Sequence, residues 1–529
     1  MAVTAPTTSA GAVDRPPLRD RATRLLLAAT VLATALRALY ATRFELAPQE
    51  AYYWQYSRHL DLSYFDHPPL TGWLIALSTG ALGSNELGVR LPAILAGGAL
   101  TLLVFRLGEQ VASRRAGVLA AVLANATILF GLGAVVITPD VPLVLCWTAA
   151  LVVLCDAVLP DRPGPGRAHW RWYALGALCG LALLSKYTAA LLPLQILATA
   201  LVLPRGRAAL RTPHPYVAVL VALAVFSPVL VWNAQHDWAS FGFQTRGRVS
   251  DSDGAHAYLA VRYVALQVLA LGPLTWLTLL ASNLWLARRW SDPRARVLLL
   301  ASAPGVALFT AMSPWIFVKM NWVAPAYVGL LAATAAWWSE RWASRRVRRY
   351  ATAVLGMGAV LTGLAHALPL VPALPFPARD DLTSGWRELA ASVDRERARP
   401  DEHGEPLVIA WGYKAASELA FYLRGQPETQ SDSALSAAGR AYDQWLPGEF
   451  HHHDAIIVID RRRQPGDADD RLARHCAKLA PLPAVTVHRG STAVTTFRMW
   501  RCEGWKMADL AGRRATERDP ARRAIVGRL

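Results

Sequence analysis

Long apolar runs separated by short polar segments occupy most of the first two thirds of the chain. A helix that crosses a bilayer needs about 20 mostly apolar residues, and eleven runs approach that length. They lie near 25–40, 87–105, 116–136, 141–159, 172–185, 188–203, 215–232, 258–286, 297–313, 322–338 and 351–372. The pattern predicts an all-α polytopic membrane bundle of about eleven transmembrane helices within residues 24–373.

The pattern changes after residue 373. Strand-like runs at 407–411, 455–459, 485–487 and 493–499 alternate with helix-like stretches, which is typical of a small α/β domain. We assign 374–505 to that domain, 1–23 to a disordered N-terminus and 506–529 to a flexible basic tail. Cys476 and Cys502 lie in this polar region, and the sequence leaves open whether they form a disulfide.

Composition and charge support a membrane protein. Hydrophobic residues make up 53% of the chain and charged residues 18%, while the net charge is +17. Arg residues cluster in the segments 106–115, 162–171, 205–211, 288–296 and 341–349, whereas the alternate loops carry few basic residues. The positive-inside rule places the Arg-rich loops and the N-terminus in the cytoplasm and the C-terminal domain outside the cell membrane. Nucleic acid is therefore not an expected partner.

The predicted outer side gathers ionisable residues. Its first loop, 43–86, includes Leu70–Leu82, which is too short to span and is expected to lie along the interface as an amphipathic helix. Charged groups near lipid are costly, so their clustering indicates a functional site. Singly, each is also explained as a solvated carboxylate or a snorkelling lysine. The candidates are Glu50, Asp66, His67, Asp140, Lys186, His236, Asp237 and Lys319.

Carboxylates and cations at the mouth of a membrane bundle suit sugar transfer from a lipid-linked phosphate. A carboxylate can take the proton of the acceptor hydroxyl, and cations can stabilise the departing phosphate. Nearby aromatic residues can stack on a sugar, although interfacial belts are their ordinary explanation. The sequence contains no P-loop or convincing dinucleotide motif, which agrees with a donor other than a soluble nucleotide.

Several motifs resemble those of one family. They are Pro48–Trp54, Ser63–Pro69, Thr138–Asp140, Leu184–Tyr187, Phe226–Trp238, Asn321–Pro325, Asp381–Trp386 and Tyr413–Tyr422. Their order is similar to that of the bacterial dolichyl-phosphate-mannose-protein mannosyltransferase-like family, which includes the aminoarabinose transferases of lipid A. The resemblance covers roughly 24–500 and implies the GT-C fold, a polyprenyl-phosphate sugar donor, and inverting transfer to a protein, lipid or glycan acceptor outside the membrane.

The resemblance also implies residue roles. The family usually has an Asp-Glu pair in its first loop, whereas this chain has Gln49-Glu50. Gln cannot accept a proton at neutral pH, so Glu50 is expected to be the base, with Asp140 supporting it and Asp66 as a substitute. His67, Lys186 and Lys319 are candidates for binding the phosphate. The other expected substrate-binding residues are Gln49, Tyr53, Tyr187, His236, Asp237 and Asn321.

No cofactor is expected to be required. A divalent cation bound by Asp66, His236 and Asp237 is the alternative. His451-His452-His453 is interpreted as a solvated loop. Two other functions stay open. A transporter or lipid flippase would place charges near mid-bilayer rather than at one rim. A non-catalytic assembly protein with the same fold is compatible with Gln49.

Overall fold

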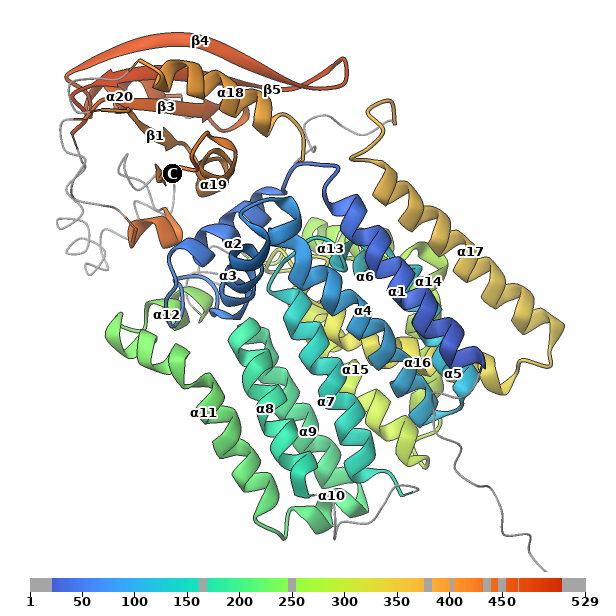
Figure 1. Ribbon diagram of the computed structural model, residues 1–529. Helices are drawn as coiled ribbons and strands as arrows, with labels where there is room; N and C mark the ends of the chain where they lie inside the picture. The colour runs from blue at the N-terminus through green and yellow to red at the C-terminus, as the bar shows by residue number, and fades with distance from the viewer. Residues whose placement is uncertain are drawn as a thin grey trace, which may run out of the picture.

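The computed structural model describes residues 21–160, 169–245, 254–374, 383–399, 404–431, 439–445, 453–464 and 466–506. Nearly all of the predicted disordered N-terminus and basic tail, together with His451 and His452, lie outside these ranges. Figure 1 shows a helical bundle with a small sheet on one end. The helical elements up to residue 367 are α1 (Arg21–Ala41), α2 (Pro48–Arg58), α3 (Leu70–Leu82), α4 (Glu86–Val111), α5 (Arg114–Asn125), α6 (Ile128–Gly133), α7 (Asp140–Val158), α8 (His169–Ser185), η3 (Tyr187–Ala190), α9 (Leu191–Val202), α10 (Pro204–Ala209), α11 (His214–Gln235), α12 (Ala239–Thr245), α13 (Ala257–Leu271), α14 (Pro273–Ala287), α15 (Pro293–Met312), α16 (Ala324–Glu340) and α17 (Arg345–Ala367).

All eleven predicted apolar runs coincide with helices, but they are not eleven equal spans. Within the described residues, α1, α4, α7, α11, α15 and α17 are long and apolar enough to cross a membrane, and α13 with α14 would make a seventh span. The run at 258–286 forms two helices that meet at 105°. This bend arises because Gly272 has φ +83° and Pro273 starts the second helix.

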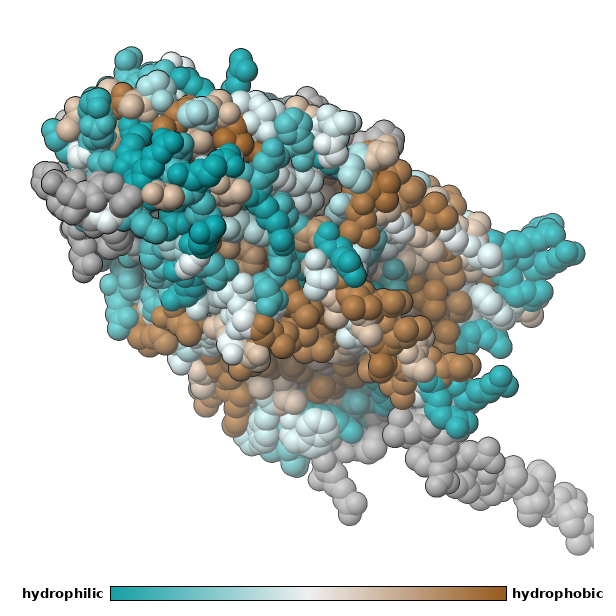
Figure 2. Space-filling view, turned by 45° about the horizontal axis from the view of Figure 1, so that its top comes forward, coloured by the Kyte–Doolittle hydropathy of each residue, from teal (hydrophilic) through white to brown (hydrophobic). Residues whose placement is uncertain are grey.

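The bundle has the surface of a multi-pass membrane protein. Figure 2 shows apolar residues gathered over the helices, whereas polar residues cover the sheet domain. Exposed side chains on α1 and α11 include Leu32, Leu36, Val219 and Leu220. The interior is also apolar, since α16 is almost wholly buried at the centre of the largest hydrophobic cluster. A helix that is apolar on its lipid face and buried on the other needs no polar stripe.

Helices α2 and α3 lie at the end of the bundle that carries the sheet (Figure 1). The structure has α3 at Leu70–Leu82, the segment that the sequence predicts to be a short helix. Pro48 starts α2, and the Glu50 carboxylate accepts the Ala47 N–H at 3.0 Å, which caps the first turn. Gly72 allows the two helices to pack closely, since a Cβ at this position would lie only 2.8 Å from the Tyr56 Cβ.

The elements of the C-terminal part are α18 (Trp386–Arg397), β1 (Leu407–Ala410), α19 (Tyr413–Tyr422), β2 (Thr429–Gln430), η6 (Arg440–Asp443), β3 (Ala455–Asp460), η8 (Arg461–Arg463), α20 (Ala468–Ala473), β4 (Lys478–Arg489) and β5 (Thr492–Glu503). The strands form a five-stranded mixed sheet in the order β2-β1-β3-β5-β4. Strand β1 pairs in parallel with β2 and β3, while β5 is antiparallel to β3 and β4. A disulfide joins Cys476 to Cys502 in β5, so the pairing left open by the sequence is present.

Helix α19 joins this domain to the first loop. One hydrophobic cluster includes Tyr52 and Trp54 of α2 together with Leu419 and Phe421 of α19. Polar contacts border the cluster: the Tyr422 hydroxyl accepts the Leu46 N–H at 2.7 Å and donates to Glu86 at 3.1 Å, while Arg58 pairs with Glu428 at 2.5 Å. The first loop and the C-terminal domain therefore form one packed layer over the bundle.

Glu418 is a buried carboxyl within that layer. It is fully buried, and neither of its carboxyl oxygens has a hydrogen-bond partner among the described residues. Burial, followed by the charges of Glu45 and Glu50, raises the pKa of Glu418 well above its usual range. The folded environment therefore favours the protonated form of the Glu418 carboxyl.

Candidate active site

Asp66 lies in the first loop beside the phenols of Tyr52 and Tyr56, which we call the phenol cage. Its Oδ1 accepts hydrogen bonds from the hydroxyls of Tyr52, at 2.9 Å, and Tyr56. The two tyrosines are four residues apart on α2 and therefore present their rings on the same face. Burial, and next the charge of Asp66, raises the pKa of Tyr52 and of Tyr56 well above the usual value. Both phenols thus stay protonated and donate to the carboxylate.

Asp140 forms a second centre at the start of α7. Its Oδ1 accepts from the Lys186 Nζ at 2.7 Å, and its Oδ2 accepts from the Asn321 Nδ2 at 2.5 Å. The side chains of Asp140 and Lys186 are both 9% exposed. The structure therefore brings together three predicted site residues from segments far apart in the chain.

The segment after α11 links the two centres. Tyr187, which follows Lys186 in the chain, contacts the Ser240 hydroxyl of α12 at 2.5 Å. From the same helix, Gln244 Nε2 donates to the Asp66 backbone carbonyl at 2.7 Å. Asp66 and Asp140 consequently belong to one region, built from the first loop, the start of α7, the α8–α9 junction and α12.

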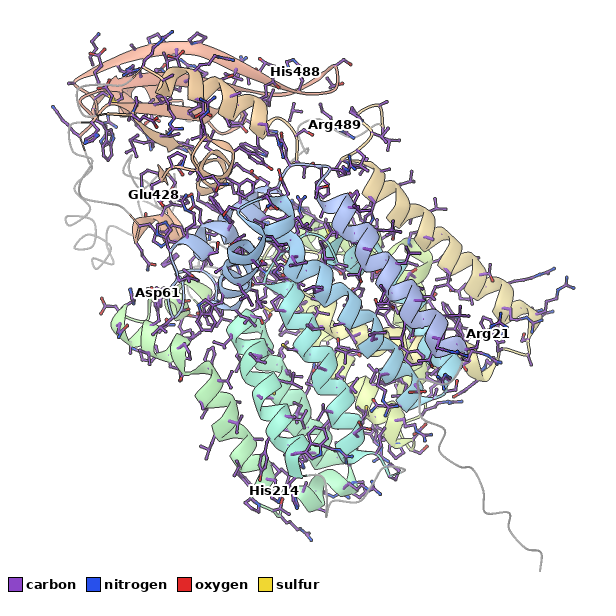
Figure 3. All side chains as sticks on the ribbon, in the orientation of Figure 1. Arg21, Asp61, His214, Glu428, His488 and Arg489 are labelled. Carbon is purple, nitrogen blue, oxygen red and sulfur yellow. A yellow bond between two sulfur atoms is a disulfide. The ribbon has the colours of Figure 1, made fainter. Side chains whose placement is uncertain are left out.

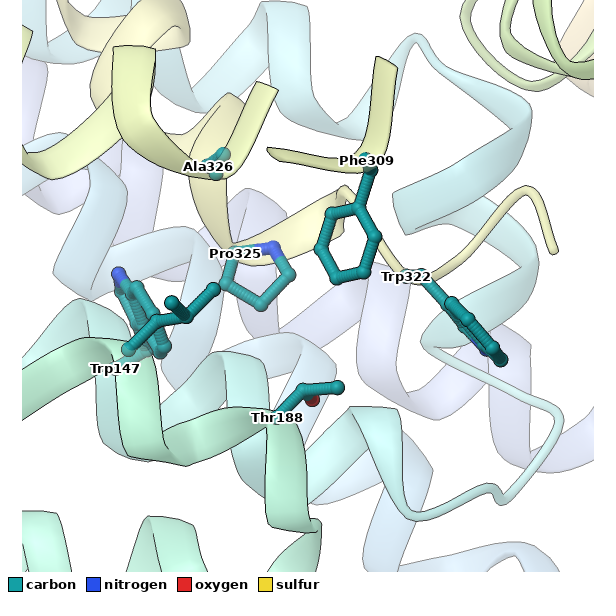
Figure 4. Close-up of a pocket in the computed structure, with 8 residues that line it drawn as sticks. Trp147, Thr188, Phe309, Trp322, Pro325 and Ala326 are labelled. Carbon is teal, nitrogen blue, oxygen red and sulfur yellow. The ribbon is translucent and has the colours of Figure 1, made fainter. Parts of the chain in front are cut away.

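A small apolar pocket lies beside the Asp140 centre (Figure 4). Trp147, Phe309, Trp322 and Pro325 line it together with Thr188, Leu191, Gly305 and Ala326. The Lys186 Nζ lies 5.8 Å from the centroid of the Trp322 ring, so the ammonium group is at the edge of this aromatic lining. The site therefore combines a held cation with adjoining apolar walls.

Glu50, expected to be the base, lies inside the fold. It is 0% exposed and pairs with Arg90 of α4 at 2.7 Å, while its two oxygens also accept the N–H groups of Ala47 and Ile137. Both oxygens are occupied, which argues against Glu50 taking a substrate proton. The Ile137 contact shows that Glu50 and Asp140 lie at the same end of the bundle.

The remaining predicted residues of the first loop are near Asp66. Gln49 is half-buried in the first turn of α2, and Tyr53 is buried. The His67 ring meets the Tyr53 ring edge to face at 5.6 Å. These placements put Tyr53 and His67 beside the phenol cage.

The other predicted residues, His236, Asp237 and Lys319, are half-buried or exposed. His236 stacks on Trp232 at 4.0 Å, and its Nδ1 contacts the Trp232 carbonyl. Asp237 and Lys319 are exposed. In the part of the chain that the structure describes, no three His, Cys, Asp or Glu side chains are grouped to hold a metal. Asp66, His236 and Asp237 are therefore not brought together as the alternative cation site would require.

Sequence reasoning missed three groups. Arg90 lies within a run interpreted as a span, and only a search for charges inside apolar runs would have found it. The Tyr52–Tyr56 spacing on a helix could have indicated a pair of phenols on one face. Arg440 comes from the C-terminal domain, and its guanidinium nitrogen lies 3.6 Å from the Asp66 Oδ2. Nothing in the sequence signals that last contact.

This membrane bundle, with acids and a held cation at one end beneath a small sheet domain, shares its fold with solved membrane glycosyltransferases. The family described as dolichyl-phosphate-mannose-protein mannosyltransferase matches residues 66–232. The crystal structure of ArnT from Cupriavidus metallidurans bound to undecaprenyl phosphate has a TM-score of 0.62 and 17% identity, and the match covers 90% of this chain and 97% of ArnT.

Two relatives narrow the class further. Lipid A galacturonosyltransferase RgtD of Rhizobium johnstonii is 27% identical over 78% of this chain and 83% of its own length. An undecaprenyl phosphate-alpha-4-amino-4-deoxy-L-arabinose arabinosyl transferase of Pectobacterium carotovorum is 27% identical over 74% of this chain and 73% of its own length. The chain is a GT-C-fold glycosyltransferase similar to the aminoarabinose transferases, and the resemblance predicted from its sequence is confirmed.

Proposed function

We propose that the protein transfers a sugar from a polyprenyl phosphate to an acceptor hydroxyl at the outer face of the cytoplasmic membrane, with inversion at the anomeric carbon. The donor is proposed because the aminoarabinosyl relative is named for undecaprenyl phosphate and the ArnT structure contains it. The sugar is mannose or another hexose or pentose, and the acceptor is a lipid, protein or glycan. No metal is assigned a role in the transfer.

The observation that carries this proposal is the buried Asp140–Lys186–Asn321 centre. Asp140 fixes the Lys186 ammonium at 2.7 Å, and the ammonium lies 5.8 Å from the centroid of the Trp322 ring. A cation held in a poorly hydrated site interacts strongly with a developing phosphate charge. We assign Lys186 to the departing phosphate, with Asp140 and Asn321 as positioning residues.

We assign the base to Asp66 rather than Glu50. The acceptor oxygen forms a bond to the anomeric carbon as the bond from that carbon to the phosphate oxygen breaks. The electron pair leaves with the polyprenyl phosphate, and the acceptor proton passes to Asp66 Oδ2. Tyr52 and Tyr56 occupy only Oδ1, so they orient the carboxylate, and the neighbour of Oδ2 is the Arg440 guanidinium at 3.6 Å.

The orientation proposed from the basic loops has support from the arrangement of the chain. In Figure 3, Asp61 and Glu428 lie at the end with the sheet domain, whereas Arg21 and His214 lie at the opposite end. The disulfide is in the C-terminal domain, which suits an oxidising compartment. We therefore place the site and this domain outside the cell membrane and the Arg-rich loops in the cytoplasm.

The test uses purified full-length protein in lipid nanodiscs with radiolabelled undecaprenyl-phosphate sugars and a membrane extract as acceptor. We expect labelled product from the wild type and a loss of about a hundredfold or more in Asp66→Asn, the order of a general base. Asp61→Asn is the matched control, since this carboxylate of the same loop binds the Trp232 indole N–H instead. Absence of product with every donor would refute the transfer, and equal losses in both variants would refute the role of Asp66.

A further inference from the structure

Arg440 belongs to the C-terminal domain but lies at the first-loop site. It starts η6, and the next residue, Ala441, donates its backbone N–H to the Tyr52 hydroxyl at 3.3 Å. Tyr442 is fixed as well, because its hydroxyl accepts from Gln55 Nε2 at 3.2 Å. The segment that carries Arg440 is thus held against α2, the helix that supplies the phenol cage.

Two aromatic rings from different segments support the guanidinium group. Its central carbon lies 5.0 Å from the Tyr413 ring of α19 and 5.3 Å from the Phe243 ring of α12. Arg440 also adopts φ +59°, a left-handed conformation that is unfavourable for a non-glycine residue. The packing therefore holds the arginine in one place although its backbone conformation is unfavourable.

Most hydrogen-bonding capacity of this guanidinium is unused by the described residues. Its polar contact is the ion pair with Asp66 Oδ2 at 3.6 Å, which is longer than a hydrogen bond. The side chain is 36% exposed, so a ligand can reach it. Arginine presents five N–H donors in a planar fork that fits phosphate or carboxylate oxygens.

We propose that Arg440 is an oxyanion-binding residue of the transfer site, contributed by the C-terminal domain. The ligand is an anionic oxygen of a lipid substrate, either the phosphate of the donor or an acidic group of the acceptor. When this oxyanion binds the guanidinium, it shares the cation that neighbours Asp66 Oδ2. The bound substrate and the proposed base are then connected through one side chain. This inference rests on the proposed function.

The experiment measures binding without turnover. Undecaprenyl phosphate is titrated into full-length protein in detergent, with undecaprenol as the neutral control lipid, for the wild type, Arg440→Gln, Arg440→Lys and Arg58→Gln. A second titration compares phosphorylated lipid A with its dephosphorylated form. Arg58→Gln is the matched control because it removes the interdomain pair with Glu428 outside the site. A loss caused only by loosened domain docking would occur equally in Arg58→Gln.

We expect Arg440→Gln to weaken the binding of one anionic lipid roughly tenfold to a hundredfold, which is the effect of losing hydrogen bonds to a charged group. Arg440→Lys should be intermediate, and the neutral lipids should bind unchanged. Loss for undecaprenyl phosphate identifies the donor phosphate, and loss for phosphorylated lipid A alone identifies the acceptor. Unchanged binding of both anionic lipids in a folded Arg440→Gln protein, or an equal loss of binding in Arg58→Gln, would overturn this inference but leave the proposed function standing. A wild type that binds neither lipid would refute the proposed function and this inference together.

Discussion

Replacing Glu50 by Gln separates a chemical role from a structural one. Glu50 and Arg90 are both 0% exposed, with contacts of 2.7 to 3.2 Å between them. Removing one partner of a buried ion pair costs about 3–5 kcal/mol. Arg90 keeps its hydrogen bonds to the carbonyls of Ala41, Phe44 and Glu45, so we expect the lower end, ~3 kcal/mol, which is more than a hundredfold in the folding equilibrium.

The assay heats detergent-solubilised protein and follows the remaining folded fraction by size-exclusion chromatography with tryptophan fluorescence. Glu50→Gln should unfold at a clearly lower temperature than the wild type. The double variant Glu50→Gln with Arg90→Met should recover part of the loss, because no unpaired charge is then buried. If Glu50→Gln instead has wild-type stability and loses a hundredfold or more in transfer, Glu50 acts in the chemistry and our reasoning is wrong.

Three further outcomes are expected. Lys186→Met should lower stability and abolish transfer, because it leaves the Asp140 carboxylate buried without its partner. Adding Asp140→Asn to Lys186→Met should restore stability but not transfer. Equal stability of the single and the double variant would contradict a buried pair. Glu418 holds its proton more tightly when folded, so its contribution to stability is complete below its unfolded pKa and declines as pH rises toward the folded pKa. In thermal melts from pH 5 to 9, stability should therefore decline less with rising pH in Glu418→Gln than in the wild type. Identical pH profiles of the two proteins would contradict this expectation. Cys502→Ser, which opens a link across 26 residues, should cost roughly 3–4 kcal/mol, measurable in the same melts under oxidising conditions.

The bundle was predictable because bilayer thickness imposes a length and composition on each helix. All eleven apolar runs became helices, and the four strand-like runs overlap β1, β3, β4 and β5. The bend between α13 and α14 was harder to foresee, although Gly272-Pro273 is visible in the sequence, since proline inside a span often only kinks it. Hydropathy indicates that a segment is buried but not how it turns.

The candidate site was predictable in composition but not in pairing. Asp140, Lys186 and Asn321 were expected on one face, and the structure joins them directly. Glu50 was expected to face a substrate, yet its partner Arg90 lies 40 residues away in an apolar run. Arg440 is separated from Asp66 by most of the chain. Such pairings depend on tertiary packing, which local periodicity does not encode.

The docking of α19 on α2 has a consequence for chimeric enzymes. Tyr52 and Trp54 pack against Leu419 and Phe421, so the first loop and the C-terminal domain would each expose apolar side chains without the other. Grafting the C-terminal domain of a relative onto this bundle would mismatch that surface unless the donor's first loop came with it. The two segments, at opposite ends of the gene, are thus expected to be exchangeable only as a pair.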